Sequence, residues 1–314
     1  MSSLSLMVRQ IESLTPRIRK LLLISTDKSP LPAFTPGAHI EITIPGERVQ
    51  RRAYSLVNNC AEGFYEIAVQ LEEESTGGSR WIHSIFEGQL VKVEEPKNFF
   101  ALNDDADHYT LIAGGIGITP ILSMARDLET RKRPYTLHYS GRSSDSMAYL
   151  DQVAQLSSKK LWVTNGDPSK RFSADVELTN PTSGNHLYIC GPNKMVNSIL
   201  NSARKLGWQE DHLHYEVFTG TLEQADDRAF EVVLKESGVT INVDPSKTVL
   251  DAMIEAGLDP MFDCRRGDCG VCVAQILEGE ADHRDICLSE RERSSGSFCT
   301  CVSRATSGRL VLDI

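Results

Sequence analysis

The sequence contains no apolar run that approaches the roughly 20 residues needed to cross a bilayer, so no membrane-spanning helix is expected. Its first seven residues lack both a basic segment and a sustained apolar segment, and they therefore do not resemble a secretory signal. The chain also has no internal repeat, no low-complexity tract and no excess of positive charge. These absences lead us to expect a cytoplasmic protein that binds neither a membrane nor nucleic acid.

The chain has 314 residues, too many for one ordinary core and enough for two or three domains. Its hydrophobic fraction of 40% and charged fraction of 24% are typical of a globular protein. These values exclude the disordered and fibrous classes.

Acidic residues and cysteines are concentrated in the last third of the chain. Residues 219–314 contain 18 Asp and Glu against 10 Lys and Arg, so they carry −8 of the formal net charge of −10. They also contain six of the eight cysteines, which leaves only Cys60 and Cys190 outside. In a cytosolic protein, such clustering points to metal or redox chemistry rather than to disulfides.

Three segments differ in their hydrophobic pattern. Residues 1–102 have short alternating stretches at 38–45, 64–71 and 89–94, separated by Pro and Gly turns, and this pattern favours an antiparallel β-barrel. One helix is expected after Gly77 and Gly78.

Residues 103–218 alternate compact apolar strands with helices, which predicts a parallel α/β sheet. The expected strands are 109–113, 135–139, 161–164, 186–190 and 213–218, and the expected helices are 120–131, 147–155 and 193–206.

Residues 219–229 resemble an exposed linker, and residues 230–314 then form a small α+β domain. In that domain, strands are expected at 230–234 and 239–243, forming a hairpin, and a helix at 248–256.

The strongest motif is the cysteine spacing of Cys264, Cys269 and Cys272, followed by Cys299. The pattern C-x4-C-x2-C…C is that of plant-type ferredoxins, which hold a [2Fe–2S] cluster. A zinc site, which usually pairs two C-x2-C knuckles, and a set of unrelated thiols are the alternatives. Cys301 lies two residues beyond Cys299 and is the alternative for the fourth ligand. The spacing of Cys299 fits the pattern a little better, so Cys301 is expected to pack nearby as a small hydrophobic residue.

A glycine-rich turn, Gly114-Gly115-Ile-Gly117-Ile-Thr119-Pro120, follows an expected strand and opens a helix. Thr119 is expected to cap this helix and Pro120 to occupy its first position. The glycines would let a pyrophosphate approach the backbone at the helix N-terminus. The turn departs from the standard dinucleotide fingerprint at its third glycine position, so alone it is also consistent with a structural turn.

Two other places offer groups that suit a nucleotide cofactor. Cys190-Gly191-Pro192 ends an expected strand of the α/β segment, where open sheets bind ligands. In the first segment, Arg52 and the Ser75–Ser79 helix start suit a phosphate, while Tyr54 and Ser55 suit a flavin ring and its N5. An ordinary barrel strand and an ordinary helix start are the alternative interpretation.

Taken in order, the motifs R-x-Y-S, G-G-S, G-G-I-G-I-T-P, C-G-P, Glu216-x-Phe218 and C-x4-C-x2-C…C resemble those of the phthalate dioxygenase reductase family. The resemblance covers essentially the whole chain, including residues 96–102 and 280–285. These are single-chain FMN and [2Fe–2S] reductases of Rieske oxygenases. The resemblance implies a fold with a flavin-binding β-barrel, a nicotinamide-binding α/β domain and a β-grasp ferredoxin domain, in that order.

The resemblance also implies roles for particular residues. Ser55, Cys190 and Phe218 would lie closest to the reacting atoms, and Thr76 departs from the Arg that many members carry before Gly-Gly-Ser. The cofactor contacts implied are Arg52, Ala53, Tyr54, Ser55 and the strand Ile67, Ala68, Val69 for the flavin; Gly77, Gly78 and Ser79 for the FMN phosphate; Gly114, Gly115, Gly117, Thr119 and Pro120 for the NADH pyrophosphate; Cys190, Gly191 and Pro192 for the nicotinamide pocket; and Phe218 beside the flavin.

The function expected from these modules is electron transfer from NADH through FMN and the [2Fe–2S] cluster, one electron at a time, to a separate oxygenase. A single basic residue after the second α/β strand, Arg142, favours NADH over NADPH. We expect a monomer whose acidic C-terminal domain docks on the oxygenase. A self-contained reductase of a quinone or ferric chelate, and a redox sensor, are the alternatives.

Overall fold

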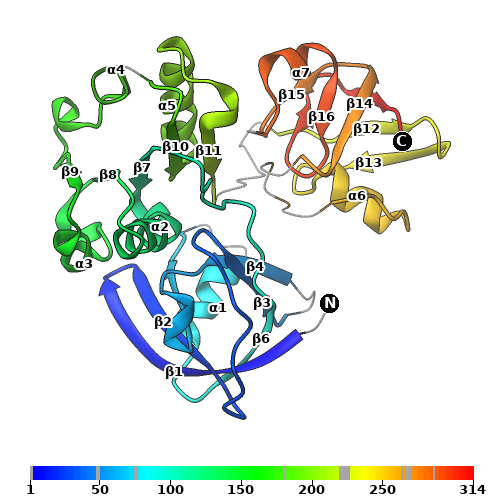
Figure 1. The fold of residues 1–314 in the computed structure, drawn as a ribbon. Coiled ribbons are helices and arrows are strands. Elements are labelled where there is room, and N and C mark those ends of the chain that lie inside the picture. Colours follow the sequence, from blue (N-terminus) through cyan, green and yellow to red (C-terminus); the bar gives the residue numbers. More distant parts are fainter. Residues whose placement is uncertain are drawn as a thin grey trace. The chain divides into compact units, whose positions relative to one another are not determined.

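The computed structural model describes residues 3–46, 50–73, 77–179, 181–218, 227–262, 265, 267, 270–285 and 287–314. The chain folds into two compact units, Met1–Glu216 and Val217–Ile314. The first unit holds a six-stranded and a five-stranded sheet, and the second holds a five-stranded and a two-stranded sheet (Figure 1).

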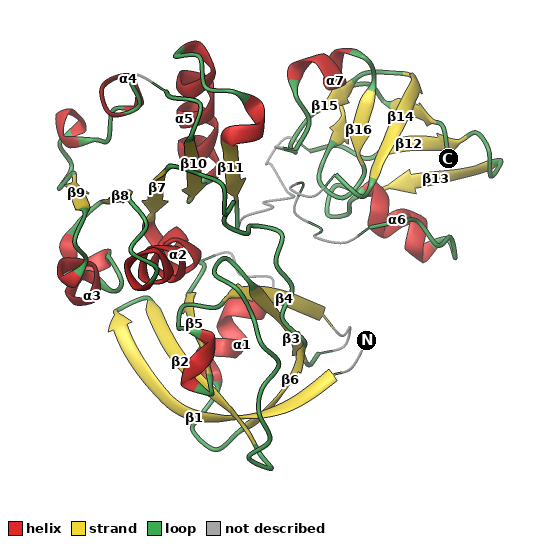
Figure 2. Ribbon diagram, in the orientation of Figure 1, coloured by secondary structure: helices red, strands yellow, loops and turns green. Residues whose placement is uncertain are grey.

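The first sheet is antiparallel and curved. Its strands follow the order β4-β3-β6-β1-β2-β5, and the two end strands, β4 and β5, contact each other, so the sheet turns towards a barrel (Figure 2). The helix expected after Gly77 is confirmed as α1, Gly78–Ser84. The strands are β1 Ser3–Thr15, β2 Ile18–Ser25, β3 His39–Ile44, β4 Gln50–Ser55, β5 Tyr65–Gln70 and β6 Leu90–Glu94.

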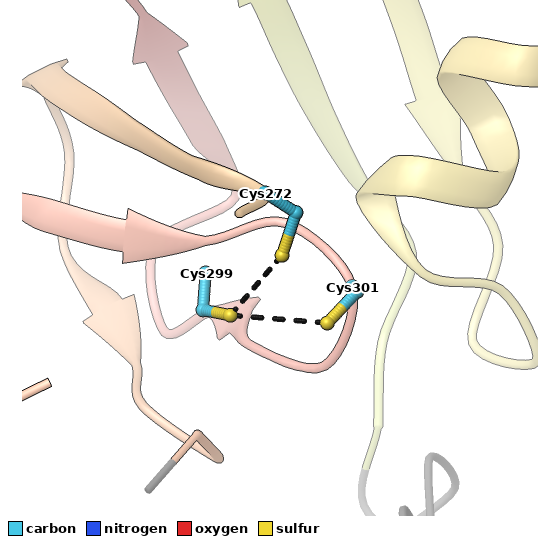
Figure 3. A group of neighbouring side chains, drawn as sticks. All are labelled: Cys272, Cys299 and Cys301. Atoms are coloured by element: carbon cyan, nitrogen blue, oxygen red, sulfur yellow. Dashed lines mark hydrogen bonds between the residues drawn. The ribbon is translucent and has the colours of Figure 1, made fainter. Parts of the chain in front are cut away.

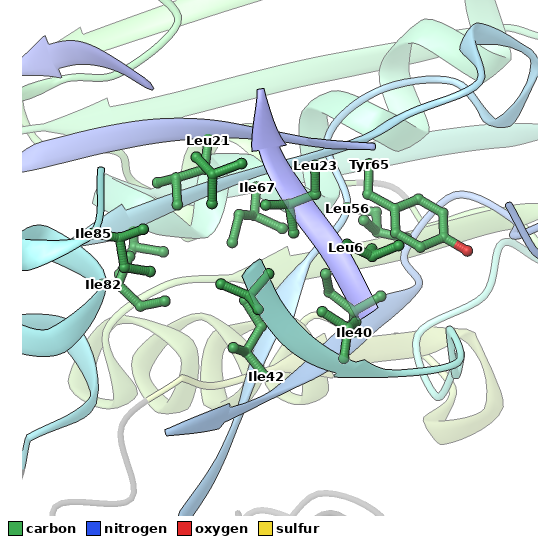
Figure 4. Close-up of a cluster of buried hydrophobic side chains, with 14 of the residues drawn as sticks. Leu6, Leu21, Leu23, Ile40, Ile42, Leu56, Tyr65, Ile67, Ile82 and Ile85 are labelled. Atoms are coloured by element: carbon green, nitrogen blue, oxygen red, sulfur yellow. The ribbon is translucent and has the colours of Figure 1, made fainter. Parts of the chain in front are cut away.

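Alternation along the strands fills the interior of the barrel. Ile40 and Ile42 of β3 point inward with Leu21 and Leu23 of β2, and all four are fully buried (Figure 4). The apolar face of α1, carrying Ile82, packs against the same core. Each such side chain contributes about 1.5–3 kcal/mol when it leaves water.

The second sheet is parallel throughout, in the order β11-β10-β7-β8-β9. Its central strands are continuous apolar runs, as is typical of a sheet covered on both faces. The strands are β7 His108–Gly114, β8 Tyr135–Gly141, β9 Lys159–Val163, β10 Asn185–Cys190 and β11 Leu213–Glu216, and the helices are α2 Ile118–Thr130, α3 Leu150–Gln155, α4 Ala174–Glu177 and α5 Asn193–Lys205.

Polar side chains join the barrel to the parallel sheet within the first unit. Arg126 of α2 donates to the backbone oxygen of Val57, at 3.1 Å, and to Oε1 of Gln152, at 2.6 Å. Beside it, burial raises the pKa of Glu66 on β5, whose carboxyl faces the buried Tyr149 hydroxyl. A boundary near residue 102, between β6 and β7, stays a prediction.

The second unit has a mixed sheet in the order β13-β12-β18-β14-β16. The expected hairpin is confirmed as the antiparallel pair β12–β13, and β12 also pairs in parallel with β18. The elements are β12 Phe230–Leu234, β13 Val239–Val243, α6 Val249–Glu255, β14 Val273–Glu278, β15 Ala281–Asp282, α7 Glu290–Ser294, β16 Ser297–Cys299, β17 Arg304–Ala305 and β18 Arg309–Leu312.

The structure confirms the predicted fold class of a multidomain chain with an antiparallel barrel followed by a parallel α/β sheet. In the part of the chain that the structure describes, no helix combines the length and the apolar character that a membrane span requires.

Candidate functional site

Two motifs that lie far apart in the sequence meet at the carboxyl ends of β7 and β10. The two strands pair in parallel, with Cys190 opposite Ala113. A Cβ atom placed on Gly117 would overlap the backbone carbonyl of Cys190, and one on Gly191 would come within 3.1 Å of the backbone of Gly114. Glycine is therefore needed here for a close backbone approach. The structure brings the predicted pyrophosphate and nicotinamide residues into one site.

Gly115 leaves room for a ligand above this turn. Its φ of +55° lies in the left-handed region, and a Cβ atom placed on it would find no atom within 4 Å. By contrast, the neighbouring Gly114 is covered by Met195 and Pro192. The open backbone at the start of a helix suits an anionic group such as a pyrophosphate.

The helix start differs from the prediction. The helix α2 begins at Ile118, after a 3₁₀ turn at Gly115–Gly117, and its N-cap residue is Gly117. The expectation that Thr119 caps the helix and Pro120 opens it is wrong. The 3₁₀ turn at Gly115–Gly117 leads directly into α2, so the helix starts before Thr119. The buried Thr119 hydroxyl does not cap the helix but donates to the backbone oxygen of Ile116, at 3.0 Å. Pro120 is still within the first turn, where its missing N–H costs no helical bond.

The predicted phosphate residues also meet. The side chain of Arg52 on β4 lies over Gly78, where a Cβ atom would come within 2.9 Å of Arg52 Cγ. Gly77, with a φ of +113°, is the N-cap of α1. The Ser79 hydroxyl accepts from the backbone N–H of Glu72, at 3.1 Å. Ser75 and Thr76 lie outside the described residues.

Ser55 ends β4, and its hydroxyl is buried. The residue is only 5% exposed, and its Oγ has no hydrogen-bond partner among the residues described. Such a hydroxyl costs about 1–3 kcal/mol unless a ligand or water satisfies it. On the same strand, Ala53 and Tyr54 are half-buried, and burial raises the pKa of Tyr54 well above its ordinary value.

The predicted flavin strand β5 is an edge of the barrel sheet, with β2 as its ladder partner among the described strands. Ile67 points into the core, while Ala68 and Val69 are almost fully buried. No sequence motif indicated that His83 of α1 would contact this strand. Its Nε2 lies 2.9 Å from the backbone oxygen of Val69, and burial lowers the pKa of His83, which favours the neutral ring.

Three thiols converge in the second unit (Figure 3). Cys272 and Cys299 have their sulfur atoms 3.3 Å apart, and the Cys301 sulfur lies 3.8 Å from that of Cys299. All three sulfur atoms lie within 4.8 Å of one another, and the three residues are buried. The thiol of Cys299 lowers the pKa of Cys272, while the same contact raises the pKa of Cys299, so the pair favours a thiolate at Cys272, the form that binds metal.

The structure thus brings Cys272 and Cys299 together as predicted, whereas Cys264 and Cys269 lie outside the described residues. It also places Cys301 beside these two thiols, near the preferred fourth ligand Cys299, as the sequence had led us to expect. Between the first two predicted ligands, Gly267 has a φ of +79°, and a Cβ atom on it would come within 2.7 Å of the Val302 side chain.

Phe218 lies at the start of the second unit, two residues after the end of β11, and is half-buried. Its predicted position beside a flavin stays a prediction.

Two family models match this chain. Residues 232–306 match a 2Fe-2S iron-sulfur cluster binding domain, and this match covers the thiol cluster. Residues 94–213 match the N-terminal domain of dimethylamine monooxygenase subunit DmmA-like proteins.

Whole-chain relatives agree with these matches. The chain is 38% identical to the carnitine monooxygenase reductase subunit of Escherichia coli, over 98% of this chain and 97% of that protein. It is 36% identical to the vanillate O-demethylase oxidoreductase of a Pseudomonas species, over 95% of each. The solved structure of phthalate dioxygenase reductase aligns with 100% of this chain and 98% of its own, with a TM-score of 0.79 and 33% identity.

The chain belongs to the phthalate dioxygenase reductase family. Members of the family are oxidoreductases, and these relatives include reductase components of oxygenase systems. The family resemblance and the ferredoxin-type C-terminal domain expected from the sequence are confirmed.

Proposed function

We propose that this chain is the NADH-dependent reductase component of a Rieske-type oxygenase system. It would pass electrons from NADH through FMN and a [2Fe–2S] cluster, one at a time, to a separate oxygenase. The observation that carries the proposal is the buried thiol cluster in a region matching an iron-sulfur domain, in a chain whose full-length relatives are named as reductases.

The residues present fit each of the three groups. The buried thiols Cys272 and Cys299, with Cys264 and Cys269 from the same motif, would hold the cluster. The Ser55 hydroxyl, which finds no partner among the described residues, suits a flavin ring, and the Arg52 side chain over Gly78 suits its phosphate.

The open backbone at Gly115, between Gly114 and Gly117, suits the pyrophosphate of NADH. Thr119 supports this turn through its bond to the backbone oxygen of Ile116, and Pro120 follows it inside α2. Cys190, Gly191 and Pro192 would line the pocket for the nicotinamide, because they lie at the end of the strand next to the turn. Arg142, the basic residue that follows β8, is the contact proposed for the adenosine end and favours NADH.

The cofactors supply the electron chemistry, because a bound flavin accepts two electrons as hydride and can release them singly. The chain positions them. Ser55 would hydrogen-bond the flavin at N5, and the strand Ile67-Ala68-Val69 would present backbone groups to its pyrimidine edge, with Ala53 and Tyr54 against the ring. Gly77, Gly78 and Ser79 would bind the phosphate. Cys190 and Phe218 would border the place where nicotinamide enters, and no side chain is needed as a general base.

An anaerobic titration tests the proposal. We expect NADH to bleach both the flavin and the cluster absorbance, because electrons pass from one to the other within the chain. The measurement is the visible spectrum after each addition of NADH, with the reduced cluster counted by electron paramagnetic resonance. A cluster that stays oxidised while the flavin is reduced would contradict the internal relay.

The oxygenase is proposed to dock on the acidic C-terminal domain, which together with the linker before it (residues 219–314) carries −8 of the formal net charge of −10. Electrostatic steering accelerates association with a basic partner and weakens as salt screens it. We therefore expect electron transfer to the oxygenase to slow between 50 and 500 mM salt, where the Debye length falls from roughly 14 to 4 Å. Rates that do not change over this range would contradict docking by charge, while NADH reduction of the flavin serves as the control.

We further propose a monomer that resides in the cytoplasm. In support of a reducing compartment, six of the eight cysteines fall in the last third of the chain, and three of them have the spacing of metal ligands rather than of disulfides.

A further inference from the structure

One arginine joins the barrel to the parallel sheet within the first unit. Arg126 of α2 donates from Nη1 to the backbone oxygen of Val57, at 3.1 Å, and from Nη2 to Oε1 of Gln152 on α3, at 2.6 Å. Val57 lies two residues beyond Ser55, the proposed flavin contact, and α2 begins directly after the glycine turn proposed for the NADH pyrophosphate. We propose that Arg126 is a positioning residue for hydride transfer, which fixes the spacing between these two sites. This inference rests on the proposed function, which supplies both cofactors.

Hydrogen bonds hold the barrel side of this contact in place. Leu56 donates its N–H to the backbone oxygen of Ala38, at 2.8 Å, and Val57 donates its N–H to that of Glu66, at 2.9 Å. Both Leu56 and Val57 are completely buried. The carbonyl that Arg126 contacts therefore belongs to a segment bonded to two other parts of the barrel, and a shift of this segment would move the end of β4 with it.

Packing holds the other side of the contact. The helix α2 contacts β7, β8 and β10, and its side chains Leu122, Ala125 and Leu128 are completely buried. Arg126 lies eight residues after the first residue of α2, which corresponds to about 12 Å along the helix axis. Because a closely packed interior transmits strain, a displacement of the helix at Arg126 reaches the glycine turn at its start.

The proposed flavin strand and the glycine turn are neighbours in this unit. The 3₁₀ turn Gly115–Gly117 contacts β5, which contains Ile67, Ala68 and Val69. Transfer between two bound groups requires their reacting atoms to lie about 3–3.5 Å apart, and a misplacement of about 1 Å can cost about 100-fold in rate. A contact that fixes the spacing between turn and barrel therefore affects the rate of transfer more than the binding of either cofactor.

Arg126 also acts on a buried carboxyl of β5. Glu66 is 7% exposed, and burial raises its pKa, while the neighbouring Tyr149 hydroxyl and the positive charges of Lys20 and Arg126 act in the opposite direction. Tyr149 is itself buried and precedes α3. Arg126 therefore offsets part of the cost of burying this carboxyl, in addition to holding Val57.

The test compares R126A, R126K and the control R131A, all made in the full chain. Arg131 ends the same helix, but its guanidinium pairs with Asp104 and Asp127, at 2.5 and 3.2 Å, both outside the barrel strands. Lysine keeps the positive charge of Arg126 but lacks its planar fork, so it can hold only one of the two acceptors.

Two readouts separate positioning from binding and from stability. The anaerobic rate of flavin reduction at increasing NADH concentrations gives the limiting rate and the apparent Kd. Hydrogen exchange of the Leu56 and Val57 amides, followed by mass spectrometry, reports directly on the segment that Arg126 holds.

We expect R126A to lower the limiting rate at least about 10-fold while the flavin content stays the same and the apparent Kd changes less than about 3-fold, because the cofactors still bind but at the wrong spacing. The Leu56 and Val57 amides should exchange at least about 10-fold faster in R126A. R126K should lie between R126A and the wild type, at least about 3-fold below the wild-type rate. R131A should match the wild type in both readouts.

A smaller fall in the R126A limiting rate would overturn the inference, as would a change confined to the Kd or an equal loss in R131A. If R126A failed to bind flavin, R126K would decide the question. A fall of at least about 3-fold with flavin bound would then support the inference, and a smaller fall would overturn it. A wild-type chain whose flavin NADH does not reduce would contradict the proposed function instead.

Discussion

A chain with both Cys264 and Cys269 replaced by alanine should lose electron delivery to a one-electron protein acceptor by at least about 100-fold while still oxidising NADH. The two substitutions remove the first two cysteines of the motif, and a [2Fe–2S] cluster of this type is held by four cysteine thiolates. The flavin and nicotinamide residues all lie outside this loop. Hydride transfer to the flavin should therefore persist, because it does not involve the cluster.

The measurement pairs two acceptors. Ferricyanide takes electrons from a reduced flavin and should be reduced at close to the wild-type rate, whereas reduction of the oxygenase should be lost. C287A, which removes a thiol of the same domain, is the matched control and should leave both rates unchanged. Equal loss with both acceptors would contradict the division of roles, because it would place the cluster before the flavin or show that the whole chain had unfolded.

The elements best predicted from the sequence are those with an uninterrupted hydrophobic pattern. The strand at 230–234 has the same bounds in the structure, as does the strand at 239–243. The parallel strands were also recognised, because strands covered on both faces are continuous apolar runs between glycines and helices.

The two longest barrel strands, β1 and β2, were not recognised, and for β1 the reason lies in its register. Irregularities between Val8 and Gln10, and again between Ser13 and Thr15, interrupt the pairing of β1 with β2. Each extra residue reverses which side chains face the core, so the alternation that identifies a strand is lost along the sequence. Register can be assigned only when the partner strand is known.

The candidate site was predictable as a set of motifs but not as a set of contacts. Glycine at 117 was expected to admit a ligand, yet its closest neighbour is the backbone of Cys190 on another strand. The position of the Cys301 thiol, 3.8 Å from that of Cys299, depends on a turn that brings the two together, and the spacing in the sequence does not reveal this turn. Similarly, Glu66 faces Tyr149 only because the barrel packs against the parallel sheet.

A buried arginine in the second unit should contribute more to stability than any exposed ion pair there. Arg304 is 3% exposed, and its guanidinium donates to the backbone oxygens of Lys247, Arg228 and Asp244, at 2.6, 3.0 and 3.2 Å. Its Nε lies 3.7 Å from a carboxylate oxygen of Asp227, whose side chain is also buried. These contacts tie residues 227 and 228, at the end of the predicted linker, to the ferredoxin-type domain.

Replacing Arg304 with alanine should lower the free energy of unfolding of this domain by about 3–5 kcal/mol, because it removes the buried donor to three backbone carbonyl oxygens and a positive charge beside Asp227. Arg309, five residues later, gives the matched control. It pairs with Glu231 at 3.1 Å, but the two side chains are 57% and 43% exposed, so R309A should cost less than about 1 kcal/mol.

Urea unfolding of the cluster-loaded protein, followed by visible circular dichroism, measures the difference. With a denaturant dependence of about 1–3 kcal/mol per molar, R304A should move the midpoint down by at least about 1 M, and R309A by much less. Asp227 remains paired with Arg284 in the R304A variant, so the domain should still fold and bind its cluster in the absence of urea. Similar midpoints for R304A and R309A would mean that burial adds nothing to this network.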